Sequence, residues 1–331
     1  MLKQINIFFL SILFFCSGCS NEVDKNALPT FDPIDVDENT IFLVNSKDDN
    51  VHKIYAIDTR NNRKIYTYEF KNKIIYDLVF DASFDMNPYI ILLSGEAFKI
   101  DVKSGKLKRI DTDIEYNPQS ISLVDNKLWL IPPGGGTNNS KKYIIYDSKK
   151  DQLENIVLPE GFFYGAWARE NNNIYLNLNF ISSQPKIYNM TAGKNIDYNL
   201  LRNDYDFFYF YQNKYLVAAI KNSSIVDTYR IDSFQPIFKK EFLFSIDSSK
   251  TLIFPAMFED NDCIYLVSRE YVTKRSKSKN YEIEKTVTFY NKSSGGSFGF
   301  YCKNGYIWLT SEENDGAYKV NMDDLSYEII K

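Results

Sequence analysis

Ile307-Trp308-Leu309 is the last copy of the short apolar triplet that decides the fold of this sequence. Six earlier triplets have the same character, and they are Ile41-Phe42-Leu43, Ile90-Ile91-Leu92, Leu128-Trp129-Leu130, Ile174-Tyr175-Leu176, Tyr215-Leu216-Val217 and Ile264-Tyr265-Leu266. Successive triplets begin 49, 38, 46, 41, 49 and 43 residues apart, about 44 on average. A recurrence at this spacing is typical of proteins built from repeated structural modules.

A second pattern follows most triplets. It is an alternating strand that ends in Asp or Asn, a tight polar turn and another alternating strand. Alternation around a polar turn predicts a β-hairpin, and Asp or Asn side chains bond to the backbone of such turns. The strands that end in these residues are 53–58, 98–101, 143–147, 187–189, 229–232 and 318–321.

A third apolar strand precedes every triplet after the first, at residues 74–80, 120–124, 164–168, 207–211, 253–258 and 298–301. Each repeat therefore predicts four short antiparallel strands, which we name A to D from the inside outward, with the triplet in strand B. Radial packing of such sheets buries the apolar faces that a single sheet leaves open. We therefore predict an all-β fold over residues 31–331, a seven-bladed β-propeller of four-stranded antiparallel blades.

The two ends of the repeat leave the blade number open. Residues 31–37 are poorly patterned, so six or eight blades are alternatives. Residues 326–330 form a regular D strand, and no strand swapped in from the other terminus is evident. How the predicted ring closes is not readable from these residues.

Composition agrees with an all-β chain. The sequence has 25 Tyr and 25 Phe but only 14 Gly, and aromatic residues favour strands. The aromatic residues at one repeat position are predicted to pack between blades, and they are Trp129, Tyr175, Tyr265 and Trp308. The net charge is −4 and the chain has no basic domain, which argues against nucleic-acid binding.

The repeat resembles the seven-bladed propellers of the quinoprotein-like and surface-antigen type that occur in bacterial lipoproteins. The resemblance covers nearly all of residues 31–331, but it is architectural and its motifs are degenerate. Propellers of this kind include scaffolds, receptors, lactonases and lyases, so the resemblance implies little about function.

The N-terminus predicts export. Lys3 precedes an apolar run over residues 7–16, which is too short for a membrane span but fits a secretory signal. Cys16-Ser17-Gly18-Cys19 resembles the lipobox of bacterial lipoproteins, although Leu is usual where Cys16 stands. The resemblance implies that residues 1–18 are removed and that Cys19 is acylated; a cleaved signal with an incidental cysteine is the alternative.

A polar segment at residues 19–30 is then predicted to tether the domain to a membrane of the cell envelope. The lipobox resemblance implies the outer membrane in a Gram-negative host, because Ser20 stands where Asp signals retention. Residues 20–30 span at most about 36 Å. The two remaining cysteines, Cys263 and Cys302, are interpreted as separate thiols, with a disulfide left as the alternative.

Function is predicted to lie on the loops that join strands B and C, because binding residues concentrate on surface loops of rigid scaffolds. Three longer connections, 134–140, 180–185 and 271–281, are interpreted as B–C loops on one face. Their candidate partner-binding residues are Gly134, Gly135, Gly136, Phe180, Tyr271, Lys274, Arg275, Lys277 and Tyr281. A solvated charge run and a flexible glycine tip are the competing interpretations.

Catalytic patterns are weak. The single histidine, His52, starts a C strand, where a structural hydrogen bond is expected, and no G-x-S-x-G motif is present. Asp77 and Asp206 begin A strands and are weak candidates for a divalent metal site in the central channel.

Two hypotheses follow. The favoured one is a monomeric, non-enzymatic binding or scaffold lipoprotein that engages a cell-envelope protein or glycan, with no cofactor and no nucleic acid. The alternative is a metal-assisted lactonase, lyase or hydrolase that uses channel carboxylates.

Overall fold

The computed structural model describes residues 28–48, 51–81, 84–112, 120–124, 127–131, 142–157, 162–170, 173–180, 183–189, 192–195, 205–211, 215–220, 223–233, 239–247, 256–289, 299–311 and 314–331. Every regular element in these ranges is a β-strand. Among them no helix has the length and apolar character that a membrane span requires. All the strands belong to one compact unit, Phe31–Lys331.

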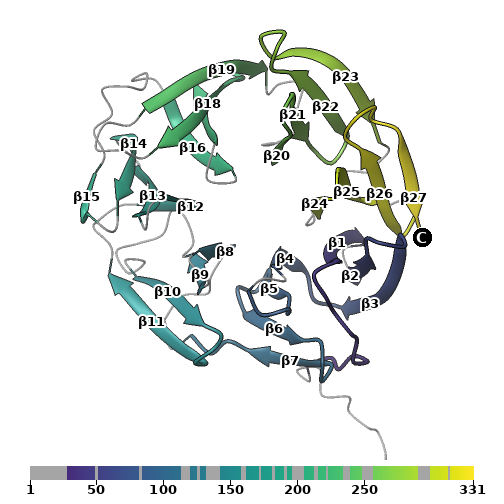
Figure 1. Ribbon diagram of the computed structural model, residues 1–331. Coiled ribbons are helices and arrows are strands. Elements are labelled where there is room, and N and C mark those ends of the chain that lie inside the picture. Colours follow the sequence, from purple (N-terminus) through teal and green to yellow (C-terminus); the bar gives the residue numbers. More distant parts are fainter. Residues whose placement is uncertain are drawn as a thin grey trace, which may run out of the picture. The chain divides into compact units, whose positions relative to one another are not determined.

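The described strands form seven antiparallel sheets, each made of strands that follow one another in the chain (Figure 1). The first sheet contains β1 (Thr40–Asp48), β2 (Val51–Asp58) and β3 (Arg63–Lys71). The second contains β4 (Ile75–Val79), β5 (Tyr89–Leu92), β6 (Ala97–Asp101) and β7 (Lys106–Arg109). The third contains β8 (Ser120–Val124), β9 (Lys127–Ile131), β10 (Lys142–Asp147) and β11 (Gln152–Val157).

The remaining four sheets repeat the same order. The fourth contains β12 (Phe162–Glu170), β13 (Asn173–Phe180), β14 (Ser183–Asn189) and β15 (Lys194–Asn195), and the fifth contains β16 (Tyr205–Tyr211), β17 (Tyr215–Ile220), β18 (Ile225–Ser233) and β19 (Lys239–Asp247). The sixth contains β20 (Ala256–Glu259), β21 (Cys263–Val267), β22 (Tyr271–Ser276) and β23 (Glu282–Thr288). The seventh contains β24 (Phe300–Lys303), β25 (Tyr306–Ser311), β26 (Gly316–Asn321) and β27 (Tyr327–Ile330).

The apolar triplets fall in the strands predicted for them. In the second to seventh sheets the triplet occupies the second strand, and in the first sheet it lies in β1. All five residues of β21 are buried, whereas β23, the outer strand of the same sheet, is almost entirely exposed. A strand buried on both faces needs a continuous apolar run, which is why the triplets are uninterrupted by polar residues.

Hydrophobic clusters join neighbouring sheets. One cluster combines Phe42 and Phe98 between the first two sheets, and another combines Tyr265 and Leu309 between the last two. Trp129, Tyr265 and Trp308 are at most 2% exposed, which confirms the prediction that they are packing residues. The side chain of Tyr175 lies outside the described part of the structure.

The first sheet differs from the prediction because its described part has three strands. The chain before β1 instead bonds to the β6–β7 turn of the second sheet, through Phe31 N–H to the Gly105 carbonyl (2.7 Å) and Ile34 N–H to the Val102 carbonyl (2.9 Å). The Phe31 ring packs edge-on against Tyr68 at 4.9 Å. Pro33 has no N–H to donate to a ladder, which disfavours an A strand at this point.

The first and last sheets pack against each other. Ile41 and Tyr55 share a buried cluster with Trp308 and Ala317. The Asp315 carboxylate accepts a hydrogen bond from the Tyr55 hydroxyl at 2.6 Å and forms an ion pair with Lys53 Nζ at 2.9 Å. The described strands of these two sheets share no ladder, so side chains account for most of this contact.

Replacing Asp315 by Ala is expected to lower the free energy of unfolding by about 1–3 kcal/mol, because it removes the acceptor of the buried Tyr55 hydroxyl. Denaturant unfolding measures the change. The matched control is Asp111→Ala, at an exposed aspartate with no hydrogen bond or ion pair among the described residues. Equal losses in the two variants would contradict a specific role for Asp315.

Acid should weaken the same contact. Burial opposes the charge of Asp315, but hydrogen bonds from Tyr55 and Lys53 outweigh it and hold the pKa of the carboxyl below its usual 3.8. A group with a lowered pKa stabilises the fold above its unfolded pKa and loses that contribution as the pH falls through the folded value. Asp315→Asn should therefore show a shallower loss of stability below about pH 4 than the natural chain.

Candidate functional site

The three predicted B–C loops differ in what the structure shows for them. Gly134, Gly135 and Gly136 fall outside the described residues. Phe180 is the last residue of β13, and it pairs with Ser183 at the start of β14. The connection predicted at 180–185 is therefore a two-residue link between paired strands rather than a long loop.

The prediction of a loop at 271–281 is wrong. Tyr271–Ser276 is strand β22, which pairs on both sides, and only residues 277–281 form a connection. That connection joins strands C and D, so it lies at the end of the sheet opposite the B–C turn. Lys274, Arg275 and Lys277 suggested a solvated loop, but Val272 and Thr273, which precede them in strand β22, are buried and hold the segment in the sheet.

The basic side chains of this segment are engaged by neighbouring groups. Lys274 Nζ donates to the Asp323 carbonyl at 2.6 Å. Arg275 donates to the Tyr281 carbonyl at 2.9 Å, and its guanidinium lies 4.6 Å from the centre of the Phe244 ring. Lys277 Nζ is 2.9 Å from a Glu259 oxygen. These cations therefore join strands and sheets, which a sequence pattern of charge does not reveal.

Asp77 joins two sheets. One carboxylate oxygen accepts the Leu78 N–H at 2.9 Å, and the other accepts the Ile121 N–H at 3.1 Å. Leu78 belongs to β4 and Ile121 to β8, the innermost strands of the second and third sheets. The side chain of Asp206, the other candidate metal ligand, lies outside the described part. No three His, Cys, Asp or Glu residues gather into a possible metal site among the described residues.

His52 also joins sheets. It is 1% exposed, and its Nδ1 accepts the Ile75 N–H at 3.2 Å, which links β2 to β4. The prediction of a structural hydrogen bond for the single histidine is confirmed. Cys263 and Cys302 are both free thiols.

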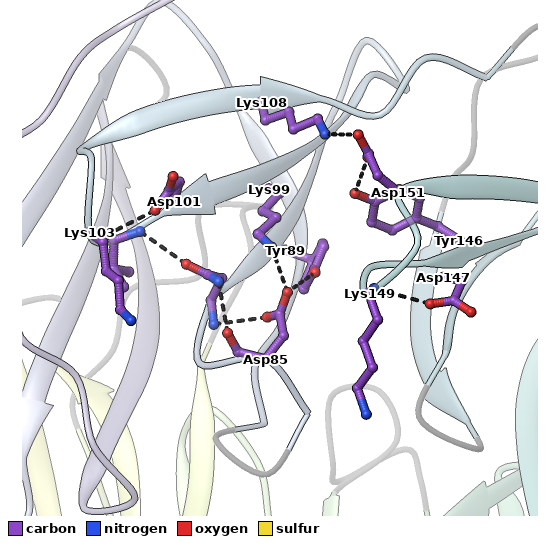
Figure 2. Close-up of polar contacts among 12 residues, drawn as sticks. Asp85, Tyr89, Lys99, Asp101, Lys103, Lys108, Tyr146, Asp147, Lys149 and Asp151 are labelled. Atoms are coloured by element: carbon purple, nitrogen blue, oxygen red, sulfur yellow. Dashed lines mark hydrogen bonds and ion pairs between the residues drawn. The ribbon is translucent and has the colours of Figure 1, made fainter.

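A set of polar contacts lies between the second and third sheets (Figure 2). We call it the turn cluster, and it consists of Asp85, Asn87, Tyr89, Lys99, Lys108, Tyr146 and Asp151. The Asp85 carboxylate accepts hydrogen bonds from the Tyr89 hydroxyl and from Lys99 Nζ, the latter at 2.7 Å. Asn87 lies in the connection before β5. Its side-chain oxygen accepts the Val102 N–H at 3.1 Å and so joins this connection to the turn between β6 and β7.

The second half of the turn cluster crosses between sheets. Lys108 on β7 bonds to the carboxylate of Asp151, and the Tyr146 hydroxyl donates to the same carboxylate at 2.7 Å. Figure 2 shows Lys108 reaching from its strand to the turn that carries Asp151. Strand β7 of the second sheet is thereby tied to the C–D turn of the third sheet.

The shifted pKa values in the turn cluster move away from neutrality. Burial, and then the hydrogen bond to Asp85, raise the pKa of Tyr89. Hydrogen bonds from Lys108 and Tyr146 lower the pKa of Asp151. A general acid or base works best with a pKa near the operating pH, so these groups suit structural hydrogen bonding and not proton transfer.

Two exposed lysines lie beside the turn cluster. Lys103 and Lys149 are exposed, and their ammonium groups form no bond with the described residues. Figure 2 shows both side chains extending away from the bonded groups. Their own backbone N–H groups donate to Asp101 and Asp147, which shapes each turn.

Sequence reasoning missed the tyrosine–aspartate pairs. Besides the two pairs of the turn cluster, Tyr265 donates to Asp260, and Tyr55 donates to Asp315. In three of the four pairs the aspartate lies four or five residues from the tyrosine, next to a polar turn. This short spacing could have been recognised in the sequence. The Tyr55–Asp315 pair could not, because its two residues are 260 apart.

Comparison with known proteins shows the fold. No protein-family model and no curated protein sequence matches this chain. A candidate 6-phosphogluconolactonase from Bacteroides fragilis is similar in structure, with a TM-score of 0.55 and 10% identity over 91% of this chain and 96% of the other.

Two further β-propeller structures are similar to about the same degree. The WD40 β-propeller domain of Doa1 has a TM-score of 0.54 and 13% identity over 86% of this chain and 90% of the other. The β-propeller domain of Cps50 (Swd1) from Myceliophteria thermophila has a TM-score of 0.52 and 8% identity over 91% and 98%. The chain therefore has a β-propeller fold. At these identities the likeness shows architecture and not function.

Asp85→Asn is expected to destabilise the protein by about 3 kcal/mol, because it leaves the charge of Lys99 unpaired. The side chains of this ion pair are only 12% and 18% exposed. The matched control is Lys103→Ala at the same end of the sheet, which should change the free energy of unfolding by less than about 0.5 kcal/mol. Similar unfolding midpoints for both variants would show that the turn cluster contributes little to the stability of this end.

Proposed function

We propose that this protein is an exported, lipid-anchored propeller of seven blades that binds a protein or glycan of the cell envelope without catalysing a reaction. The anchor is Cys19, released as the new N-terminus when residues 1–18 are removed. The partner engages the end of the propeller that carries the B–C connections.

The bonding of Asp77 is the observation that carries the non-enzymatic part of the proposal. Both of its oxygens accept backbone N–H groups, one in its own sheet and one in the next. A divalent ion binds through carboxylate oxygens, so binding at Asp77 would have to compete with these two hydrogen bonds. The geometry supports a residue that joins sheets more than a metal ligand.

The seven blades are supported by the contact between the first and last sheets. Phe42 and Phe98 sit in a cluster that joins the first sheet to the second, and Ile41 and Trp308 sit in one that joins it to the seventh. Because the first sheet is covered on both faces, no further blade is needed between the first and seventh sheets.

The partner-binding end is proposed from the loop lengths. The B–C connection of the second sheet, 93–96, and that of the sixth, 268–270, are short. The third sheet has ten residues, 132–141, between β9 and β10, including Gly134, Gly135 and Gly136. An insertion on an otherwise compact repeat is a common position for recognition. Residues 271–281 are not part of this end.

Membrane attachment is tested by Cys19→Ser. We expect the natural chain in the membrane fraction of the host and in the detergent phase after phase separation, because acyl chains contribute about 0.8 kcal/mol per buried CH₂. The variant should be soluble after export. If both forms remain in the membrane fraction, the anchor is not at Cys19.

The partner-binding end is tested by affinity capture from solubilised membranes. Deleting four residues from 134–140 should abolish capture of a specific partner. The double variant Lys103→Ala, Lys149→Ala, which alters exposed residues at the opposite end, should retain it. Loss of the partner in both variants would contradict the assignment of the end.

The enzymatic alternative is tested with metal ions. If the channel carboxylates hold a divalent ion, adding Ca²⁺ or Mg²⁺ raises the unfolding temperature of the natural chain but not that of Asp77→Asn. The proposal expects no such difference. A rise confined to the natural chain would support a metal-assisted lactonase, lyase or hydrolase instead.

A further inference from the structure

The first sheet presents a different edge to the ring centre from the other sheets. The other six each have a strand inside the one that carries the triplet, whereas β1 is the innermost strand of the first sheet among its described residues. Thr59 N–H donates to the Asn39 carbonyl at 3.0 Å, one step before the first pair of the β1–β2 register. Because bonded pairs alternate along an antiparallel ladder, the N–H and C=O groups of Phe42 and Val44 point away from β2, toward the inner edge.

The last sheet covers this inner edge. The Val44 carbonyl accepts a hydrogen bond from the Thr310 hydroxyl at 2.7 Å and another from the Gly299 N–H at 3.2 Å. Thr310 lies in β25 and is 1% exposed, and its own N–H donates to the Gly299 carbonyl at 3.0 Å. We call Val44, Gly299 and Thr310 the latch, because they join the two sheets at an edge where the other sheets have a further strand.

Gly299 fits this position because it has no side chain. A Cβ there would lie 2.6 Å from the Val44 nitrogen and 2.9 Å from the Leu43 Cα, and both are backbone atoms. The backbone just before β24 therefore rests directly against β1. Figure 1 shows these two strands next to each other on the inner side of the ring.

The latch lies at the one contact between neighbouring sheets that the described chain does not cross. Each sheet is made of consecutive strands, so the chain runs from every sheet to the next, but the first and seventh sheets are not consecutive. The first sheet has a further tie to the second, because Phe31 N–H donates to the Gly105 carbonyl at 2.7 Å. A break in the ring would therefore detach the first sheet from the seventh and leave it attached to the second.

We infer that the ring opens between its first and seventh sheets, and that the latch holds this contact closed on the channel side. Opening exposes the buried cluster that contains Ile41, Tyr55 and Trp308, while each sheet keeps its own ladder. It also gives the interior of the ring a lateral route to solvent. Such an event is a local opening, with a smaller free energy than global unfolding. It depends on the described contact between the two sheets and not on the lipid anchor or the partner.

The test measures how often each face of the first sheet is exposed. Single cysteines replace two alanines that are both 0% exposed. Ala317→Cys lies in the cluster between the seventh and first sheets, and Ala56→Cys lies in the cluster between the first and second. A thiol reagent labels the folded protein, and mass spectrometry of each peptide separates the new site from Cys263 and Cys302. Unfolding midpoints confirm that both variants fold.

Labelling at position 317 should be faster than at position 56, because the rate follows the population of the opened form. Adding Thr310→Val removes the hydroxyl of the latch. It should speed labelling at 317 about tenfold, as expected for the loss of one buried hydrogen bond, and leave position 56 unchanged. Thr310→Ser keeps a hydroxyl and is the matched control, so it should change the rate much less.

Three results would overturn the inference. The first is equal labelling at the two positions, with both rates following global unfolding as denaturant is added. The second is an equal acceleration at both positions by Thr310→Val, which would mean that Thr310 stabilises the whole fold. The third is no acceleration at 317 by Thr310→Val.

A second variant serves if Thr310→Val does not fold. Asp315→Ala takes its place, because the bond between Tyr55 and Asp315 crosses the same contact between the first and last sheets. It should accelerate labelling at 317 and not at 56. Acceleration at both positions, or at neither, would again overturn the inference.

Discussion

The structure depends on the burial of two apolar faces on each sheet. Strand β21 is buried throughout, and every residue of β25 after Tyr306 is buried. Each of these inner strands therefore needs a neighbour on both sides. The clusters that join successive sheets supply these neighbours along the chain. The first and last sheets would each keep one bare face without the contact around Tyr55 and Trp308. Side chains supply most of this contact, and Asp315 adds a directional bond although the described strands of the two sheets share no ladder.

The repeat could be predicted because burial acts directly on local sequence. A strand packed on both faces must be apolar without interruption, and its outer partners alternate, so the triplets and the turn aspartates recur at a readable spacing. The three-stranded first sheet could not be predicted in this way. Residues 31–37 bond instead to Gly105, some 70 residues later, and no local pattern encodes a contact over that distance. The segment is fixed by a glycine whose importance is visible only in three dimensions.

The candidate sites were less predictable, and the reason is physical. Lys274 and Arg275 have the composition of a solvated loop, yet both lie in a strand because their apolar stems and the buried Val272 fit the sheet. Asp77 was identified correctly as an inner-strand carboxylate, but the amides that its oxygens accept lie partly in the next sheet. Whether a charge is used for chemistry or for cohesion depends on such non-local partners. The tyrosine–aspartate pairs show the same principle, because only the pairs close in sequence left a signal.

We propose that this propeller is held at a membrane by a lipid on Cys19, and the proposed binding of a cell-envelope partner depends on this anchor. Mass spectrometry of the N-terminal peptide from the protein purified out of its own membranes tests that claim most directly. We expect a peptide that begins at Cys19 and carries a diacylglyceryl group on its sulfur. A peptide that begins at Met1, or an unmodified one that begins beyond Cys19, would contradict it.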